Sequence, residues 1–177
     1  MVNLQQPGAD SFPMSASAST AELELLIFAL EGQRCGLPLH AVERIVPAAE
    51  ITPLPKAPAV VLGVIDVEGT ILPVLSMRRR FGFAEREIRI TDQFLIAHTP
   101  RRPVVLVIDE AQGVRKIAAA RMTRAEKVVP GFEHVRGVAA LEDGLVLIHD
   151  LEKFLSLDEA VALEEAMAAN EGGPHGR

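Results

Sequence analysis

The chain has 177 residues, a length that suits one domain, undivided or built of two lobes, with room for a hydrophobic core. An apolar fraction of 49% argues against a disordered chain, and a net charge of −6 argues against a general nucleic-acid binder. Trp and Tyr are absent, so the core must be built largely from Val, Ile, Leu and Ala.

Charge is spread unevenly along the chain. Between Arg78 and Lys127 there are 12 Lys and Arg against 6 Asp and Glu, whereas residues 151–169 hold 5 acidic residues and 1 basic one. Such runs are typical of solvated faces. The sharper alternative is a basic region that touches an acidic partner.

Cysteine usage and hydropathy favour a cytoplasmic protein. Cys35 is the one cysteine, so no disulfide can form within the chain, which is consistent with a reducing compartment. No segment approaches the roughly 18 apolar residues that span a bilayer. The N-terminus has no basic start followed by an apolar block, so we expect no secretion signal.

The chain begins with a predicted disordered tail and a first hairpin. Residues 1–20 are rich in Ser, Ala and Pro and show no hydrophobic periodicity, so we expect disorder there. Leu23–Leu30 and Arg34–Leu37 have the length and composition of strands, and Glu31-Gly32-Gln33 between them is typical of a turn.

An irregular, proline-rich connection is predicted after this hairpin. Pro38 suits the first position of a single helical turn, which leads to a strand near Ile45–Val46. The connection that follows is pinned by Pro47, Pro53, Pro55 and Pro58.

The densest apolar stretch, Val60–Leu75, predicts the hairpin around which the fold is organised. Two apolar runs meet at the polar tip Asp66-Val67-Glu68-Gly69, which is typical of a turn. Pro73 has no N–H for a ladder, so it should lie at an edge, a bulge or a strand margin. Met77–Phe81 then predicts a short basic helix that Gly82 closes.

The middle of the chain predicts two or three more strands. Ala84–Ile90 is charged and predicts a loop, and Gln93–Ala97 predicts a strand. The continuous apolar run Val104–Ile108 is typical of a strand buried on both faces. Asp109–Gly113 predicts a bend, after which Val114–Ile117 favours another strand.

A second hairpin closes the predicted sheet structure. Residues 118–129 are ambiguous between a helix and a strand with a loop, and an irregular loop is the interpretation that we favour. Val135–Ala140 and Leu145–Ile148 predict strands, and Glu142-Asp143-Gly144 predicts a type I′ turn between them. Strands at this spacing, each with its own turn, predict a β-barrel or β-sandwich.

A helix over about 157–169 is predicted at the end. Ser156 and Glu159 form a capping box, the pairing of a side-chain acceptor with a residue three positions later. We expect residues 170–177 to form a disordered tail. The apolar side of the helix is predicted to consist of Leu157, Ala160, Val161, Leu163 and Met167.

No arrangement of residues predicts catalysis, a metal site or a cofactor. The sequence contains no phosphate-binding loop, dinucleotide-binding glycine pattern or nucleophile elbow, and its histidines are too far apart for a zinc motif. We expect Cys35 to be a small core residue. We expect Arg78-Arg79-Arg80 to present a solvated basic face, and Asp66 and Glu68 to be solvated carboxylates rather than an acid–base pair.

Four stretches, in this order, resemble the CheW-like chemotaxis adaptor family, and the resemblance covers Leu23 to about Met167. The first is L-L-I-F-A-L-E-G-Q-R-C-G-L-P-L-H-A-V-E-R-I-V. The second is the proline-rich I-T-P-L-P-K-A-P with G-V-I-D-V-E-G-T-I-L-P-V-L-S-M-R-R-R-F-G. The others are V-V-L-V-I-D-E-A-Q-G-V-R-K-I and H-V-R-G-V-A-A-L-E-D-G-L-V-L-I-H-D-L-E-K-F-L.

The resemblance implies a mostly β fold of two packed five-stranded SH3-like β-barrels with a hydrophobic seam, short helices and a C-terminal helix, over residues 21–169. It implies a scaffold without catalysis that couples a CheA-type histidine kinase to the cytoplasmic tip of methyl-accepting chemoreceptors. The groove between the lobes takes the receptor's helices, and one lobe pairs with the regulatory domain of the kinase. Such a protein is cytoplasmic and is recruited to membrane-associated receptor arrays.

The resemblance also places the residues that contact partners. Val42, Glu43 and Arg44 lie where the family has its first receptor-facing turn. The tip Asp66-Val67-Glu68-Gly69 lies where the family usually has Asn, an apolar residue, Arg and Gly. Because Glu68 reverses a charge at an interface, it is expected to change the choice of partner. The hypothesis is a divergent array whose partner carries the complementary positive charge.

Two alternatives stay open from the sequence. One is a CheW-like adaptor of a non-flagellar chemosensory pathway, such as pilus motility. The other is a small nucleic-acid-binding β-barrel that uses Arg78–Arg80 and Arg101-Arg102, although the net charge and the scarcity of aromatic residues argue against it.

Overall fold

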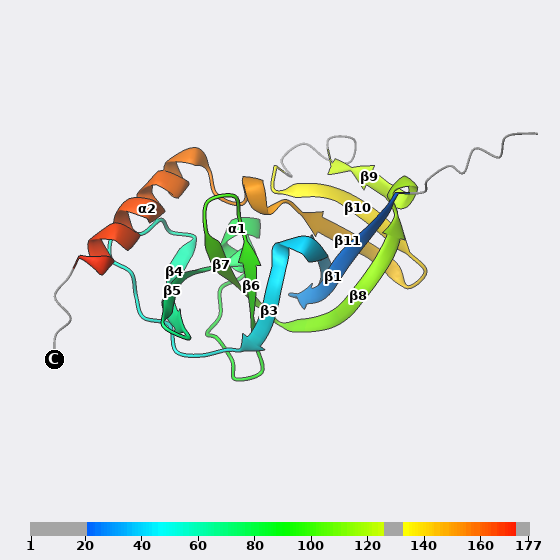
Figure 1. Cartoon of the computed structure of the whole chain (residues 1–177). Helices are drawn as coiled ribbons and strands as arrows, with labels where there is room; N and C mark the ends of the chain where they lie inside the picture. Colours follow the sequence, from blue (N-terminus) through cyan, green and yellow to red (C-terminus); the bar gives the residue numbers. More distant parts are fainter. Residues whose placement is uncertain (1–20, 126–132, 173–177) are drawn as a thin grey trace, which may run out of the picture.

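The computed structural model describes residues 21–125 and 133–172, which form two β lobes side by side with a helix packed along one of them (Figure 1). The predicted tail at 1–20, residues 173–177 of the predicted tail at 170–177, and the end of the predicted loop at 118–129 lie outside these residues. The strands are β1 (Glu22–Leu30), β2 (Gln33–Pro38), β3 (Val42–Pro47), β4 (Val61–Val67), β5 (Thr70–Leu75), β6 (Gln93–His98), β7 (Pro103–Ile108), β8 (Glu110–Ala118), β9 (Met122–Arg124), β10 (Val135–Leu141) and β11 (Gly144–His149). The helices are α1 (Met77–Phe81), α2 (Leu157–Glu171) and the short 3-10 turns η1 (Leu39–Ala41), η2 (Ala119–Arg121) and η4 (Leu151–Lys153).

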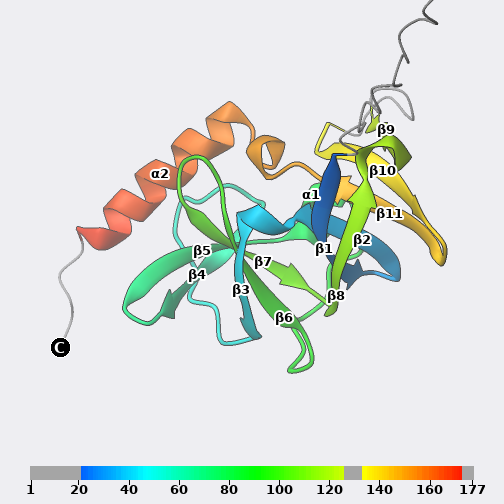
Figure 2. The same ribbon diagram turned by 45° about the vertical axis from the view of Figure 1, so that its right-hand side comes forward.

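The chain builds the first lobe from both of its ends and the second lobe from its middle. The sheet of the first lobe has the strand order β8-β1-β2-β11-β10-β9, and that of the second lobe has the order β3-β6-β7-β5-β4. The mostly β, two-lobed fold is confirmed. The first lobe has six strands where the resemblance implied five, because the three-residue β9 pairs with β10 inside a segment expected to be an irregular loop. Figure 2, turned by 45°, shows α2 lying along the second lobe.

Alternation along the strands divides the apolar side chains among three clusters. In β1, Leu25 and Ile27 belong to the interior of the first lobe, whereas Leu26, Phe28 and Leu30 face the other way. Successive strand residues point to opposite faces, so one strand contributes to two cores. The largest cluster joins residues of both sheets to Leu163, Ala166 and Met167 of α2. It is the hydrophobic seam between the lobes.

The β4–β5 hairpin lies where the sequence predicts it. Glu68 and Gly69 at its turn have φ of 53° and 86°, the two positive values of a type I′ turn. Gly63 lies at a bulge in β4 beside an isolated bridge between Thr52 and Val64, which ties the proline-rich connection to the edge of the sheet. Pro73 lies inside the sheet, directly before the position where β5 begins to pair with β7.

Local details differ from the sequence-based prediction in the second half of the chain. β8 begins at Glu110 rather than after the predicted bend, and it accommodates Gly113 at an irregularity in its pairing with β1. The β10–β11 turn is not type I′, because neither Glu142 nor Asp143 has a positive φ and Gly144 is already the first residue of β11. Helix α2 ends at Glu171, later than predicted and within the expected tail.

The buried face of α2 also differs. The capping box of Ser156 and Glu159 is present as predicted. Leu157 and Val161 were expected on the apolar side, yet they are 70% and 45% exposed. The buried residues are Ala160, Leu163, Ala166 and Met167. In the described part of the chain, no helix has the length and apolar character needed to cross a membrane.

Candidate partner-binding surfaces

The fold brings together the two segments that the sequence singles out. Val42–Arg44 opens β3 and Asp66–Gly69 forms the tip of the β4–β5 hairpin, at the two ends of the strand order of the second lobe. Nη1 of Arg44 donates to Oε1 of Glu68 at 2.9 Å. The name tip surface is used below for Val42, Glu43, Arg44, Asp66, Val67, Glu68 and Gly69.

Charges on the tip surface are paired within the chain. The hydrogen bond from Arg44 lowers the pKa of Glu68, and the same bond raises the pKa of Arg44. Oε2 of Glu43 lies 2.9 Å from Nε2 of His98 in β6. Oδ1 of Asp66 accepts from the N–H of Gly69 at 2.7 Å, so this carboxylate holds the turn. The acidic residue at the tip is therefore one half of an ion pair rather than a lone reversed charge.

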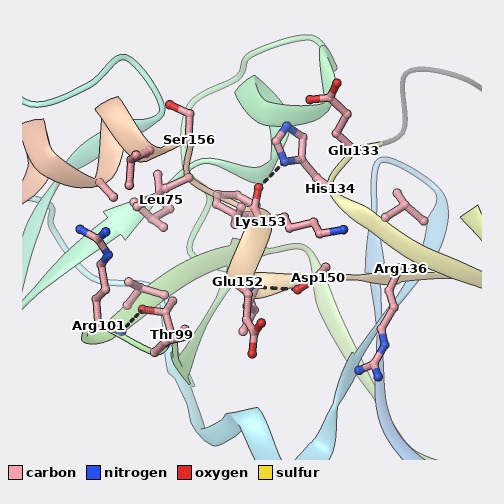
Figure 3. Close-up of a pocket in the computed structure, with 18 of the residues that line it drawn as sticks. Leu75, Thr99, Arg101, Glu133, His134, Arg136, Asp150, Glu152, Lys153 and Ser156 are labelled. Carbon is pink, nitrogen blue, oxygen red and sulfur yellow. Dashed lines mark hydrogen bonds between the residues drawn. The ribbon is translucent and has the colours of Figure 1, made fainter. Parts of the chain in front are cut away.

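A groove of about 1180 Å³ runs between the lobes on the side where η4 and the start of α2 lie (Figure 3). Its volume exceeds that of most small-molecule sites. We call it the interlobe groove. It is lined by Leu75, residues 99–102, Val104, Met122, Arg124, Ala125, residues 133–136, residues 150–157, Ala160, Leu163 and Glu164.

Several polar groups in the interlobe groove hold the local backbone. Nδ1 of His134 lies 2.6 Å from the carbonyl oxygen of Lys153, to which it donates (Figure 3). Oδ1 of Asp150 accepts from the N–H of Glu152 and so caps η4. Thr99 accepts from the backbone N–H groups of the β6–β7 turn. These side chains shape the groove from several elements.

Comparison with known proteins identifies the family. The model of the CheW-like domain matches residues 24–159, which span both lobes, the tip surface and most of the interlobe groove. The chain belongs to the CheW-like domain family. This is a family of non-catalytic adaptors. Within residues 21–125 and 133–172, no three His, Cys, Asp or Glu side chains are grouped to hold a metal ion.

Relatives agree with this assignment, and a solved structure has the same fold. Chemotaxis protein CheW of Rhizobium meliloti is 28% identical over 141 residues, covering 78% of this chain and 91% of the relative. Protein FrzA of Myxococcus xanthus is 30% identical over 105 residues, covering 59% of this chain and 66% of FrzA. The crystal structure of the scaffolding protein TtCheW from Thermoanaerobacter tengcongensis superimposes with a TM-score of 0.72 at 23% identity, covering 78% of this chain and 96% of TtCheW.

In this CheW-like chain the arginine run is not the solvated basic face that the sequence predicted. Arg78 is buried, and its guanidinium pairs with Asp109 at 2.6 Å and with Glu31. Arg79 pairs with Glu85, Arg80 with Glu159 of α2, and Arg102 with Glu164 of α2. Because these charges are neutralised within the chain, they are not available to phosphates. This weakens the nucleic-acid alternative.

Two buried titratable groups in the CheW-like fold have strongly shifted pKa values. Burial raises the pKa of the Cys35 thiol to about 12, as fits the core residue that the sequence predicted. Burial, with a smaller contribution from His134, lowers the pKa of His149 to about 4. The His149 ring centroid lies 4.4 Å from that of Phe81 and 6.5 Å from that of Phe28. No described residue hydrogen-bonds to either of its ring nitrogens.

His149 is expected to make the fold acid-sensitive. The unfolded chain takes up a proton at this residue near pH 6.5, and the folded chain only near pH 4, so the unfolded state binds more protons between these values. The contribution of His149 to the free energy of unfolding should therefore fall as the pH drops from about 6.5 towards 4, by about 3 kcal/mol in total, and then level off. Urea unfolding at pH 7.5, 5.5 and 4.5 measures this dependence.

The control for the histidine prediction is His149→Leu, which removes the titrating group and keeps an apolar side chain at the site. This variant should lose most of the pH dependence of stability between pH 6.5 and 4.5, while keeping the dependence that comes from Glu68 and Asp92, whose pKa values are lowered by hydrogen bonds from arginines. If the free energy of unfolding depended on pH equally in the original chain and in His149→Leu, the assignment to His149 would be contradicted.

Proposed function

We propose that the chain is a chemotaxis scaffold adaptor that couples a CheA-type histidine kinase to methyl-accepting chemoreceptors. The observation that carries the proposal is the CheW-like domain over residues 24–159, together with curated relatives named CheW that align over most of their own length. The protein acts by holding two partners at once, without turnover. We infer a cytoplasmic protein that its receptor partner recruits to membrane-associated arrays.

Each partner is proposed to use a different surface. The interlobe groove takes the helices of the receptor tip, as its size and the exposed Leu157 at its edge favour. The tip surface contributes the charged contacts that select the receptor or the regulatory domain of the kinase. Its support is the position of Val42–Arg44 and Asp66–Gly69 in the resemblance, and the ion pair that joins these two segments.

The experiment that tests the proposal is a pull-down with the full chain from extract of the native cells. Recovery of a histidine kinase together with a methyl-accepting receptor is the expected result, and recovery of neither would refute it. The same experiment decides between a flagellar and a non-flagellar pathway, because the kinase and receptor that are recovered identify the pathway. The relative FrzA is the observation that keeps the second pathway in view.

Charge reversal at the tip surface should weaken partner binding. Glu68→Arg places a second guanidinium against Arg44, which removes the ion pair and leaves two like charges side by side. We expect the dissociation constant for the cognate receptor fragment or for the kinase regulatory domain to rise about tenfold or more. Calorimetric titration of the purified full chain with each partner measures the change.

The control for Glu68→Arg is Glu142→Arg, the same change at the exposed β10–β11 turn of the first lobe. This variant should bind both partners as the original chain does. A third variant, Arg44→Glu with Glu68→Arg, restores an ion pair of opposite orientation and tests whether orientation or neutrality matters. Unchanged affinity of the single variant for both partners would count against a role of Glu68 in partner choice.

A further inference from the structure

Exposed cations surround the interlobe groove. Arg101 comes from the β6–β7 turn, Arg124 from β9, Arg136 from β10 and Lys153 from η4, and all four side chains are exposed. None of them forms an ion pair with a residue that the structure describes. Figure 3 shows Arg101 and Arg136 on opposite sides of the groove with Lys153 between them.

Acidic residues of the groove do not cancel this charge. Glu164 is occupied by Arg102 of the same chain, and Asp150 accepts the backbone N–H that caps η4. Glu133 and Glu152 are the remaining acidic lining residues in the described part of the chain. Asp150 keeps its negative charge while it caps η4, so the four unpaired cations face three anions and the lining of the groove has an excess of one positive charge, although the whole chain has a net charge of −6.

The floor of the groove and its lip at α2 are apolar. Beneath it lie the buried Leu75, Val104 and Leu163 of the seam, and the half-buried Met122 and Leu155 line it within reach of a partner. Leu157 lines it at the start of α2 and is 70% exposed, and Val161, one helical turn further on, is 45% exposed. These two side chains give the lip of the groove an exposed apolar edge that the apolar face of a partner can contact.

The tip surface has the opposite sign. It carries Glu43, Asp66 and Glu68 against the single cation Arg44. The two candidate surfaces of the chain therefore differ in charge as well as in shape. Like-charge juxtaposition at an interface costs several kcal/mol, so each surface disfavours the partner of the other.

We propose that the interlobe groove is selective for an amphipathic helix whose apolar face is flanked by Asp or Glu. The apolar side chains of such a helix enter the groove, and its acidic flanks meet Arg101, Arg136 and Lys153 on the rim. The inference rests on the proposed function, in which the helix belongs to the receptor, and it adds the sign of the charge by which the groove recognises it.

Two fluorescent helical peptides test this selectivity against the full chain. They share one pattern of Leu anchors at i, i+3, i+4 and i+7 and differ only in carrying Glu or Lys at the flanking positions. Anisotropy titration at low salt should give at least about tenfold tighter binding of the Glu peptide, and salt should weaken this preference. Equal binding of the two peptides, or binding of neither, would overturn the inference.

Charge-reversed variants assign the preference to the rim. Arg101→Glu with Arg136→Glu should abolish or invert it, and Lys153→Glu alone should reduce it. The matched control is Arg115→Glu on the exposed edge of β8, outside the groove, which should leave it unchanged. Circular dichroism of each variant, expected to match that of the original chain, checks that these changes at exposed positions leave the fold intact. A preference that survives reversal of the rim would refute the assignment.

The receptor fragment separates this inference from the proposed function. If the fragment binds the chain but the rim variants bind it equally well, charge recognition by the groove is wrong and the adaptor function stands. If the fragment does not bind while the Glu peptide is still preferred, the adaptor function is wrong and the selectivity of the groove stands.

Discussion

Replacing Gly63 by Ala is expected to destabilise the second lobe severely. A β-carbon at this position would lie 2.2 Å from the carbonyl oxygen of Thr52 and 2.9 Å from its carbonyl carbon. These are backbone atoms held by two hydrogen bonds between Thr52 and Val64, so they cannot move without opening the bridge. The φ of 152° at Gly63 adds backbone strain. We expect a loss of about 3 kcal/mol or more in the free energy of unfolding, measured by urea denaturation.

Gly69→Ala is the matched control for this clash. Gly69 has a φ of 86° at the hairpin tip, and nothing lies within 4 Å of a β-carbon built there. The variant therefore experiences backbone strain without a clash and should lose about 1 kcal/mol. Equal losses in the two variants would show that strain alone, and not the contact with Thr52, requires glycine at position 63.

Features that depend on neighbours in the sequence were predictable. The β1–β2 and β4–β5 turns each place a Glu-Gly pair with positive φ between apolar runs, a local pattern that decides the turn type. The capping box of α2 and the left-handed Gly82 after α1 also rest on residues within one turn of the chain. The continuous run Val104–Ile108 predicted a strand inside a sheet, and β7 is the middle strand of the second lobe.

Features that depend on distant partners were not predictable. The arginine run looks like a solvated face because Glu31, Asp109 and Glu159, which pair with it, are between 31 and 79 residues away. The prediction of which face of α2 is buried was wrong for a related reason. Alanine-rich helices have two similar apolar sides, and the surface against which the helix packs decides which side is buried.

The same distinction holds for the candidate site. The family resemblance placed the two segments of the tip surface. It did not predict the ion pair between Arg44 and Glu68, because this pair joins the first and the last strand in the order of the second sheet. The interlobe groove is lined by β5, β7, β9, β10, η4 and α2. No single stretch of sequence carries a signal for such a surface. The uneven distribution of charge along the chain was a partial indication of a basic surface, because the basic region from Arg78 to Lys127 includes Arg101 and Arg124 of the rim.

Removal of the Asp109 carboxylate is the second change with a large expected effect. Asp109 lies between β7 and β8, where the chain crosses from the second lobe to the first. Its Oδ1 accepts from Arg78 at 2.6 Å and from Arg86 at 2.9 Å, and its Oδ2 accepts from the N–H of Glu31 at 2.8 Å. Asp109→Leu leaves the buried guanidinium of Arg78 with half of its partners, so we expect a loss of about 3 kcal/mol in the free energy of unfolding.

Glu85→Leu provides the comparison for Asp109→Leu. It also removes the carboxylate partner of an arginine, but Arg79 and Glu85 are 35% and 58% exposed, so its cost should stay within about 0.5 kcal/mol. Losses of similar size would mean that burial of Arg78 does not make Asp109 important. Asp109 does not line the interlobe groove, so folded Asp109→Leu should still bind the acidic helical peptide. Stability and recognition are then separate properties, carried by two sets of arginines: those paired across the lobes hold the fold, and those left exposed on the rim select the partner.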